Sequence, residues 1–208
     1  MKVLSFILGT SSAMLVALSA SVAAHEPGAH VHGVASLQVA IDGKQVSIDM
    51  DSPLDNIVGF EHAAKTDKDR QAIKAMAAKF HQGEKLFVLT PAAQCTLQSV
   101  NLNSAVIDPT LLAKEGAGPT SPNSPAAPAS PTPPSEVKPT AAGKKSAAVH
   151  GDLEATLSFV CANPTVLKEL DVRLFDAFPH LKRLNAALVG PRGQTSAKLT
   201  AAKTQLSW

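Results

Sequence analysis

The stretch VASLQVAIDGKQVSIDMD, residues 34–51, decides how this chain folds. Its first part is an apolar run, and its second part alternates apolar with polar side chains, placing Val46, Ile48 and Met50 on one side. A period of two is typical of a β-strand with one buried face. Asp42-Gly43, between the two runs, is typical of a tight hairpin turn. The sequence therefore predicts two strands joined by a hairpin.

The residues that follow predict a helix and then further strands. Thr66-Asp67-Lys68-Asp69 is typical of a helix start, with Asp69 at the position that Glu usually holds in a capping box. The apolar spacing carries the helix to about Gln82, and we expect Gly83 to end it. Alternating or short apolar runs predict strands at 86–89, 95–102, 149–161, 170–174, 184–189, 195–199 and 204–208. The predicted fold class is a β-rich α+β protein.

The chain is divided by composition into four segments. Residues 1–24 have a positive start, an apolar stretch and small residues up to Ala24, which is typical of a secretory signal peptide. A membrane anchor is the alternative, and the short apolar stretch disfavours it. Residues 114–147 are rich in Pro, Ala and Ser without apolar periodicity, and predict a disordered linker. It separates a first α+β half, 25–113, from a second half, 148–208.

The two halves share letters at their starts. Both 31–33 and 149–151 read Val-His-Gly, and each of these Val-His-Gly segments leads directly into a long predicted strand. One interpretation is an old duplication, which gives two similar β-hairpin/helix/β-hairpin halves packed together. The other is chance, because only a few letters match.

Charge and motifs disfavour several classes of function, although they exclude no enzyme outright. Lys and Arg number 19 against 17 Asp and Glu, so the net charge of +2 gives no field that would favour nucleic acid. The phosphate-binding, dinucleotide, nucleophile-elbow, HExxH and CxxC motifs are absent from the sequence.

Two cysteines, Cys95 and Cys161, are expected to form a disulfide if the chain is exported to an oxidising compartment such as the bacterial periplasm. A thiolate metal site is the alternative.

The histidines predict a metal site. His25, His30 and His32 follow the predicted cleavage point closely, and His30 and His32 have the spacing that places side chains on one face of a strand. His150, Asp152 and Glu154 repeat that spacing. If the two Val-His-Gly strands are neighbours, His30, His32 and His150 meet beside a carboxylate, a ligand set that suits Zn²⁺.

Alternatives remain open for these residues. Asp152 is either a ligand or the acceptor that fixes an imidazole tautomer. His62 is either a further ligand or a polar contact at the start of a helix. His81, at a predicted helix C-terminus, and His180, in a loop, are expected to be structural or exposed. The histidines as a group also have the simpler interpretation of exposed polar residues at strand ends.

Five ordered blocks carry a family resemblance. HEPGAHVHGVASLQVAIDG, SPLDNIVGFEHA, Phe-x-Cys at 159–161, LDVRLFDAFPHL and LVGPRGQ together resemble a family of zinc-regulated periplasmic zinc-binding proteins that serve a zinc-uptake system. The resemblance implies a non-catalytic zinc binder that works with an envelope importer, and points to His30, His32 and His150, then to His25, Asp152 and His62. The chain departs from that family in its linker, where a loop rich in His, Asp and Glu is replaced by Pro, Ala and Ser.

These observations predict a periplasmic protein that buffers zinc or delivers it to an uptake system. The alternative is a periplasmic protein-interaction module whose histidines are incidental. A hydrolytic zinc enzyme is a third interpretation, but no second motif supplies a base beside an open metal position.

Overall fold

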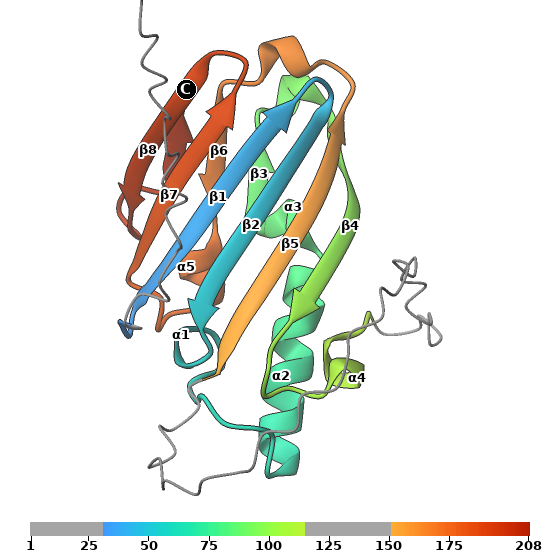
Figure 1. Ribbon diagram of the computed structural model, residues 1–208, viewed down its shortest axis with the longest axis vertical. Helices are drawn as coiled ribbons and strands as arrows, with labels where there is room; N and C mark the ends of the chain where they lie inside the picture. The colour runs from blue at the N-terminus through green and yellow to red at the C-terminus, as the bar shows by residue number, and fades with distance from the viewer. Residues whose placement is uncertain (1–30, 115–150) are drawn as a thin grey trace, which may run out of the picture.

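A six-stranded sheet forms the front layer of the molecule, which is known here from a computed structural model that describes residues 31–114 and 151–208 (Figure 1). The strand order is β4-β5-β2-β1-β7-β8. The strands are β1 (Val34–Asp42), β2 (Gln45–Pro53), β4 (Cys95–Asn103), β5 (Asp152–Cys161), β7 (Arg183–Gly190) and β8 (Gly193–Leu199). The predicted signal peptide, most of the predicted linker, and His25, His30 and His150 lie outside the described residues.

A second layer covers one face of this sheet. It contains a three-stranded sheet of order β3-β6-β9, whose strands are β3 (Phe87–Leu89), β6 (Glu169–Val172) and β9 (Gln205–Ser207). Its longest helix is α2 (Asp67–Phe80). The short helices are α1 (Asp55–Val58), α3 (Gly83–Leu86), α4 (Pro109–Leu112) and α5 (Leu174–Ala177), with 3₁₀ turns η1 (Pro91–Ala93) and η2 (Pro164–Val166). The β-rich α+β class is confirmed.

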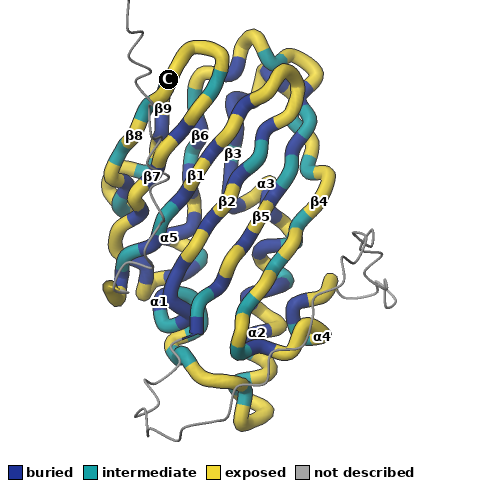
Figure 2. Tube along the Cα trace, in the orientation of Figure 1, coloured by how far each residue is buried: buried dark blue, intermediate teal, exposed yellow. Residues whose placement is uncertain are grey.

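The predicted hairpin is present, and it sets the burial of the large sheet. β1 and β2 pair antiparallel with Ile41 opposite Val46, and the turn between them contains Gly43 at φ 55°. Leu37 and Ile48 are fully buried, whereas the intervening side chains face away from the core. Figure 2 shows this alternation along β1, β2, β5 and β7. Since the period of two places one face against the second layer, the other face is left open and polar.

The two halves of the chain share both sheets instead of forming separate units. β5 of the second half lies between β4 and β2 of the first, and β6 pairs with β3. The second half also has no counterpart of the 14-residue helix α2 among its described residues. The expected pair of packed, similar halves is therefore corrected to one interleaved structure, because long-range strand pairing is invisible in local sequence patterns.

The capping box of α2 is confirmed. Thr66 accepts a hydrogen bond from the Asp69 backbone N–H, and the Asp69 carboxylate accepts from the backbone N–H groups of Lys65 and Thr66 at 2.9 and 3.0 Å. These two backbone donors, Lys65 first, hold the pKa of the Asp69 carboxyl below its ordinary value. The helix ends at Phe80 with His81 as its cap.

Gly83 does not end α2 as expected. It begins α3, and a Cβ at this position would lie 2.2 Å from Leu157 Cδ2. A larger side chain here would displace the buried Leu157 side chain of β5, which is a packing constraint that the sequence does not show.

The predicted disulfide is confirmed. Cys95 and Cys161 are directly opposite in the β4–β5 ladder and form a bond between residues 66 positions apart. A thiolate metal site is thereby excluded for this pair.

None of the helices in the described parts of the chain has the length and apolar character needed to cross a membrane.

Candidate functional site

One short segment, residues 54–61, links the starts of β1 and β5 at the lower end of the large sheet (Figure 1). The Leu54 N–H donates to the Gly151 carbonyl at 2.9 Å, and the Gly151 N–H donates to the Glu61 carbonyl at 3.1 Å. On the other side, the Asn56 side chain accepts from the Gly33 N–H and donates to the Val34 carbonyl at 3.0 Å. Residues 54–61 are therefore hydrogen-bonded to the glycines that end the two Val-His-Gly segments.

β1 and β5 are not neighbours. The predicted metal site had as a condition that the two strands that follow the Val-His-Gly segments lie side by side, and this condition is corrected. Both pair with β2, antiparallel to it, so they run parallel and begin at the same end. The spacing of about 4.8 Å between adjacent strands places their starts about 10 Å apart. Residues 54–61 occupy that end of the sheet, so their side chains become neighbours of both strand starts.

His32 lies in a turn and not on a strand. β1 begins at Val34, and Gly33 between them has φ 79°, a conformation that glycine adopts easily. The strand spacing proposed for His30 and His32 therefore does not apply at His32. The turn leaves the His32 side chain 63% exposed at the lower end of the sheet.

Two carboxylates face the His32 ring, one at each nitrogen. His32 Nδ1 is 3.1 Å from Asp55 Oδ2, and His32 Nε2 is 3.3 Å from Glu61 Oε1. Asp55 begins α1, directly after the anchored Leu54. Glu61 is more enclosed, with 14% of its side chain exposed and its Oε1 atom inaccessible to solvent. Sequence reasoning missed both carboxylates, because only the tertiary fold brings them to His32.

His62 lies in the same loop with one nitrogen occupied. Its Nδ1 is 2.9 Å from the Ala63 carbonyl, and its ring stacks on Phe60 with centroids 4.8 Å apart. A carbonyl only accepts, so Nδ1 carries the proton of this contact and the Nε2 lone pair is left for another partner. The geometry is compatible with both sequence interpretations, a polar contact before α2 and a further ligand.

Asp152 and His180 lie at this end too. Asp152 is the first residue of β5, opposite Pro53 in the register, and its Oδ1 atom is inaccessible to solvent. The His180 ring packs beside Gly59, with its Cε1 3.5 Å from the point where a Cβ would lie. His180 was expected to be structural or exposed. It is exposed, and its place beside the end of α1 makes it a further candidate.

His81 lies elsewhere. Its Nε2 is 2.8 Å from the Leu112 carbonyl, which ties the end of α2 to α4. Its expected structural role is thus supported by a specific contact.

No set of three or more His, Cys, Asp or Glu side chains is arranged to hold a metal ion within residues 31–114 and 151–208. The Nδ1 and Nε2 atoms of His32 point to different carboxylates, so His32, Asp55 and Glu61 do not converge on one point. His25, His30 and His150, three of the six predicted ligands, lie outside these ranges.

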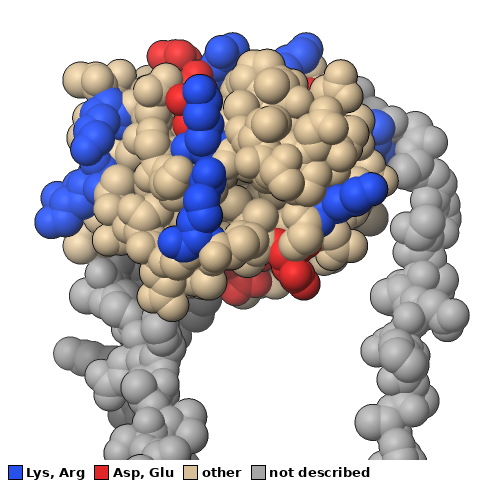
Figure 3. Space-filling model, turned by 90° about the horizontal axis from the view of Figure 1, so that it is seen from above, with Lys and Arg blue, Asp and Glu red and all other residues tan. Residues whose placement is uncertain are grey.

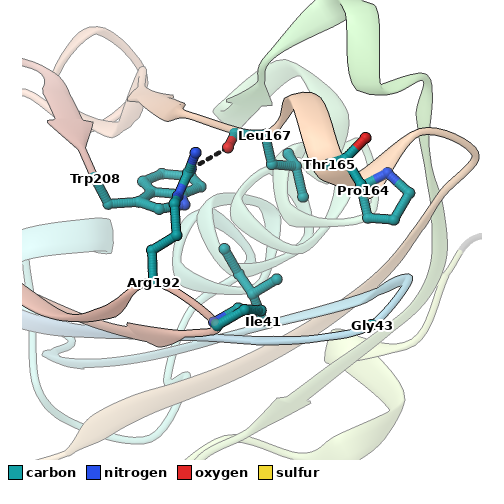
Figure 4. A pocket seen from close by; sticks show the side chains of 8 residues that line it. Ile41, Gly43, Pro164, Thr165, Leu167, Arg192 and Trp208 are labelled. Atoms are coloured by element: carbon teal, nitrogen blue, oxygen red, sulfur yellow. Dashed lines mark hydrogen bonds between the residues drawn. The ribbon is translucent and has the colours of Figure 1, made fainter.

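The opposite end of the molecule has an apolar hollow of about 260 Å³ (Figure 4). It lies between the β1–β2 turn, η2 and the β7–β8 turn, where Ile41, Leu167 and Trp208 face one another. The Arg192 guanidinium donates to the Leu167 carbonyl at its edge. Seen from above, much of this end is uncharged, with Lys and Arg side chains at its margins and in a row across it, and Asp and Glu at two edges (Figure 3). The hollow is lined by no His, Cys, Asp or Glu among the described residues, so it differs in chemistry from the lower end.

Comparison with known proteins gives one family. The sequence model described as "ZrgA family zinc uptake protein" matches residues 29–208. A search among curated proteins gives no match. The matched range includes both Val-His-Gly segments, residues 54–61 and the disulfide.

Proposed function

Because the chain belongs to the ZrgA family of zinc uptake proteins, we propose that it binds Zn²⁺ in the periplasm and buffers the ion or delivers it to an envelope uptake system. This family is not known as catalytic. Zinc is cargo in this proposal, so the site must accept the ion and also release it.

The proposed site is at the lower end of the large sheet, with His30, His32 and His150 as its main ligands. The observation that carries this assignment is the pair of hydrogen bonds from residues 54–61 to Gly151, together with those from Asn56 to Gly33 and Val34. His150 precedes Gly151, and His30 is two residues before His32. Consecutive Cα atoms are about 3.8 Å apart, so these histidines are attached to the two anchored strand starts.

The nearby side chains fit zinc chemistry. With both cysteines in a disulfide, the donors at this end are imidazole nitrogens and carboxylate oxygens, a set that zinc accepts. His25, His62, Asp152 and His180 are the further candidates. The exposure of His32 suits a site that loads and unloads an ion, because both the ion and a partner protein can approach it.

Equilibrium dialysis with metal analysis tests the proposal. We expect the exported chain to retain zinc, and the double variant His30→Ala/His32→Ala to lose most of that binding. His81→Ala is the matched control, since its contact is with the Leu112 carbonyl of α4 and not with residues 54–61 or with either Val-His-Gly segment. A wild-type protein that retains no zinc above the buffer level would refute the proposed function.

One observation favours the second candidate, a protein-interaction module. The apolar hollow beside Trp208 is the kind of concave surface that binds a partner's apolar side chain. The dialysis experiment separates the two functions, because an interaction module with incidental histidines would retain no zinc.

A further inference from the structure

We propose that Glu61 is a zinc ligand and that Asp55 is the positioning residue that orients the His32 ring toward the ion. This inference rests on the proposed zinc-binding function and adds two residues to its site.

The separation of His32 Nε2 and Glu61 Oε1 matches the edge of a zinc tetrahedron. Zinc binds nitrogen and oxygen at about 2.0–2.1 Å, and two ligands of a regular tetrahedron with such bonds lie about 3.3–3.4 Å apart. The two atoms are 3.3 Å apart in the structure. The spacing of these two atoms therefore suits coordination by one ion.

Glu61 is held in place from two sides. Its carbonyl accepts from the Gly151 N–H at 3.1 Å, which fixes its backbone beside the residue that follows His150. Its side chain is only 14% exposed and its Oε1 atom is inaccessible to solvent. A carboxylate already confined in this way loses little conformational entropy when it binds an ion, and this favours affinity.

Asp55 occupies the other side of the same ring. Its Oδ2 is 3.1 Å from His32 Nδ1, the nitrogen that faces away from Glu61. When an ion lies between Nε2 and Glu61, a carboxylate at Nδ1 holds the proton on Nδ1 and leaves the Nε2 lone pair for the metal. Asp55 is itself fixed, because it follows Leu54, whose N–H donates to the Gly151 carbonyl.

The charges at this end agree with a divalent cation as the occupant. Zinc would place a positive ion between the neutral His32 ring and the Glu61 carboxylate, so the ion would lie directly against an enclosed negative charge. A mixed nitrogen and oxygen donor set with no thiolate or thioether also favours Zn²⁺ over Cu⁺. The two methionines within the described ranges, Met50 and Met76, are each 2% exposed in the core.

The experiment compares Glu61→Gln, Glu61→Asp and Asp55→Asn with wild type, with Glu84→Gln as the control. Glu84 is an exposed carboxylate in the first turn of α3. Zinc affinity is measured by competition with a chromophoric chelator. Thermal melts in EDTA report whether each variant is folded.

We expect at least a tenfold loss of affinity for Glu61→Gln and a smaller loss for Glu61→Asp, which keeps the charge. Asp55→Asn should lose about 10–100-fold, as is usual for partners of metal-binding histidines. The visible spectrum of the Co²⁺ form should change for Glu61→Gln, because a ligand is replaced. The ¹⁵N shifts of His32 in the metal-free protein should show less proton on Nδ1 for Asp55→Asn, and the opposite change for Glu61→Gln, because each variant removes the carboxylate at one ring nitrogen.

The outcomes distinguish a failure of the proposed zinc binding from a failure of the roles assigned to Glu61 and Asp55. If wild type binds no zinc, the proposed function fails. If wild type binds zinc and the folded Glu61 variants bind within twofold of it with an unaltered Co²⁺ spectrum, Glu61 is not a ligand. If Asp55→Asn changes neither affinity nor the His32 tautomer, Asp55 has no positioning role.

Discussion

Asn56 provides a sharp test of how the lower end of the sheet is built. Its side chain is 1% exposed and makes hydrogen bonds with the Gly33 N–H, the Val34 carbonyl and the Ser52 hydroxyl. Asn56→Ala removes these three hydrogen bonds and leaves the Gly33 N–H, the Val34 carbonyl and the Ser52 hydroxyl without the Asn56 side chain as their partner. At about 1 kcal/mol for each hydrogen bond, the free energy of unfolding should fall by about 3 kcal/mol.

Urea unfolding in EDTA measures this loss without a contribution from zinc. For a chain of this size, about 3 kcal/mol also corresponds to a melting temperature lower by about 6–12 °C. Asn101→Ala is the control, because Asn101 is exposed on the open face of β4 and should stay within about 0.5 kcal/mol of wild type. A loss for Asn56→Ala as small as that of the control would refute the assigned role of Asn56.

Two further predictions concern stability. The intact mass under non-reducing conditions should lack the two thiol hydrogens. Replacing Cys95 and Cys161 by Ala should lower the free energy of unfolding by about 4 kcal/mol by the chain-entropy estimate. Freely alkylatable thiols in the native protein would contradict the disulfide. The Asp69 carboxyl has a lowered pKa in the folded state, so its stabilising effect is complete above its ordinary pKa of 3.8 and is lost as the pH falls through the lowered value. Asp69→Asn should therefore destabilise the protein at about pH 6 and approach wild type in acid, as unfolding curves at several pH values will show; a difference that is constant with pH would count against the carboxylate.

The local part of the fold is predictable from the sequence. The β1–β2 hairpin, the capping box at Thr66 and the strand around Leu157 all follow from short-range patterns, and the structure contains them. The four-residue helix α1 is not predictable in this way, because it is too short to show a period. The interleaving of the two halves is also hidden, since a strand's pattern gives its buried face and not its neighbour.

The candidate site likewise contains residues that the sequence pattern indicates and residues that only the tertiary fold brings together. His32 stands out in the sequence because of its neighbours His25 and His30, and it does lie at the shared end of β1 and β5. Asp55 and Glu61 carry no such signal. They reach His32 only because β2 lies between β1 and β5 and delivers residues 54–61 to that end. His180 is brought there by the loop before β7, because the N–H groups of Lys182 and of Arg183, the first residue of β7, donate to the Gly33 carbonyl at 2.8 Å.

The most direct test of the central claim is a thermal melt of wild type and His150→Ala, each with EDTA and with excess zinc. A site shared by the two Val-His-Gly segments joins parts of the chain from both sides of the linker, so bound zinc stabilises the folded protein by mass action. The gain is about 2.7 kcal/mol when free zinc is 100 times Kd. We predict a zinc-dependent rise in melting temperature for wild type and a much smaller rise for His150→Ala. No rise in wild type, or the full wild-type rise in His150→Ala, would contradict a site shared by the two Val-His-Gly segments.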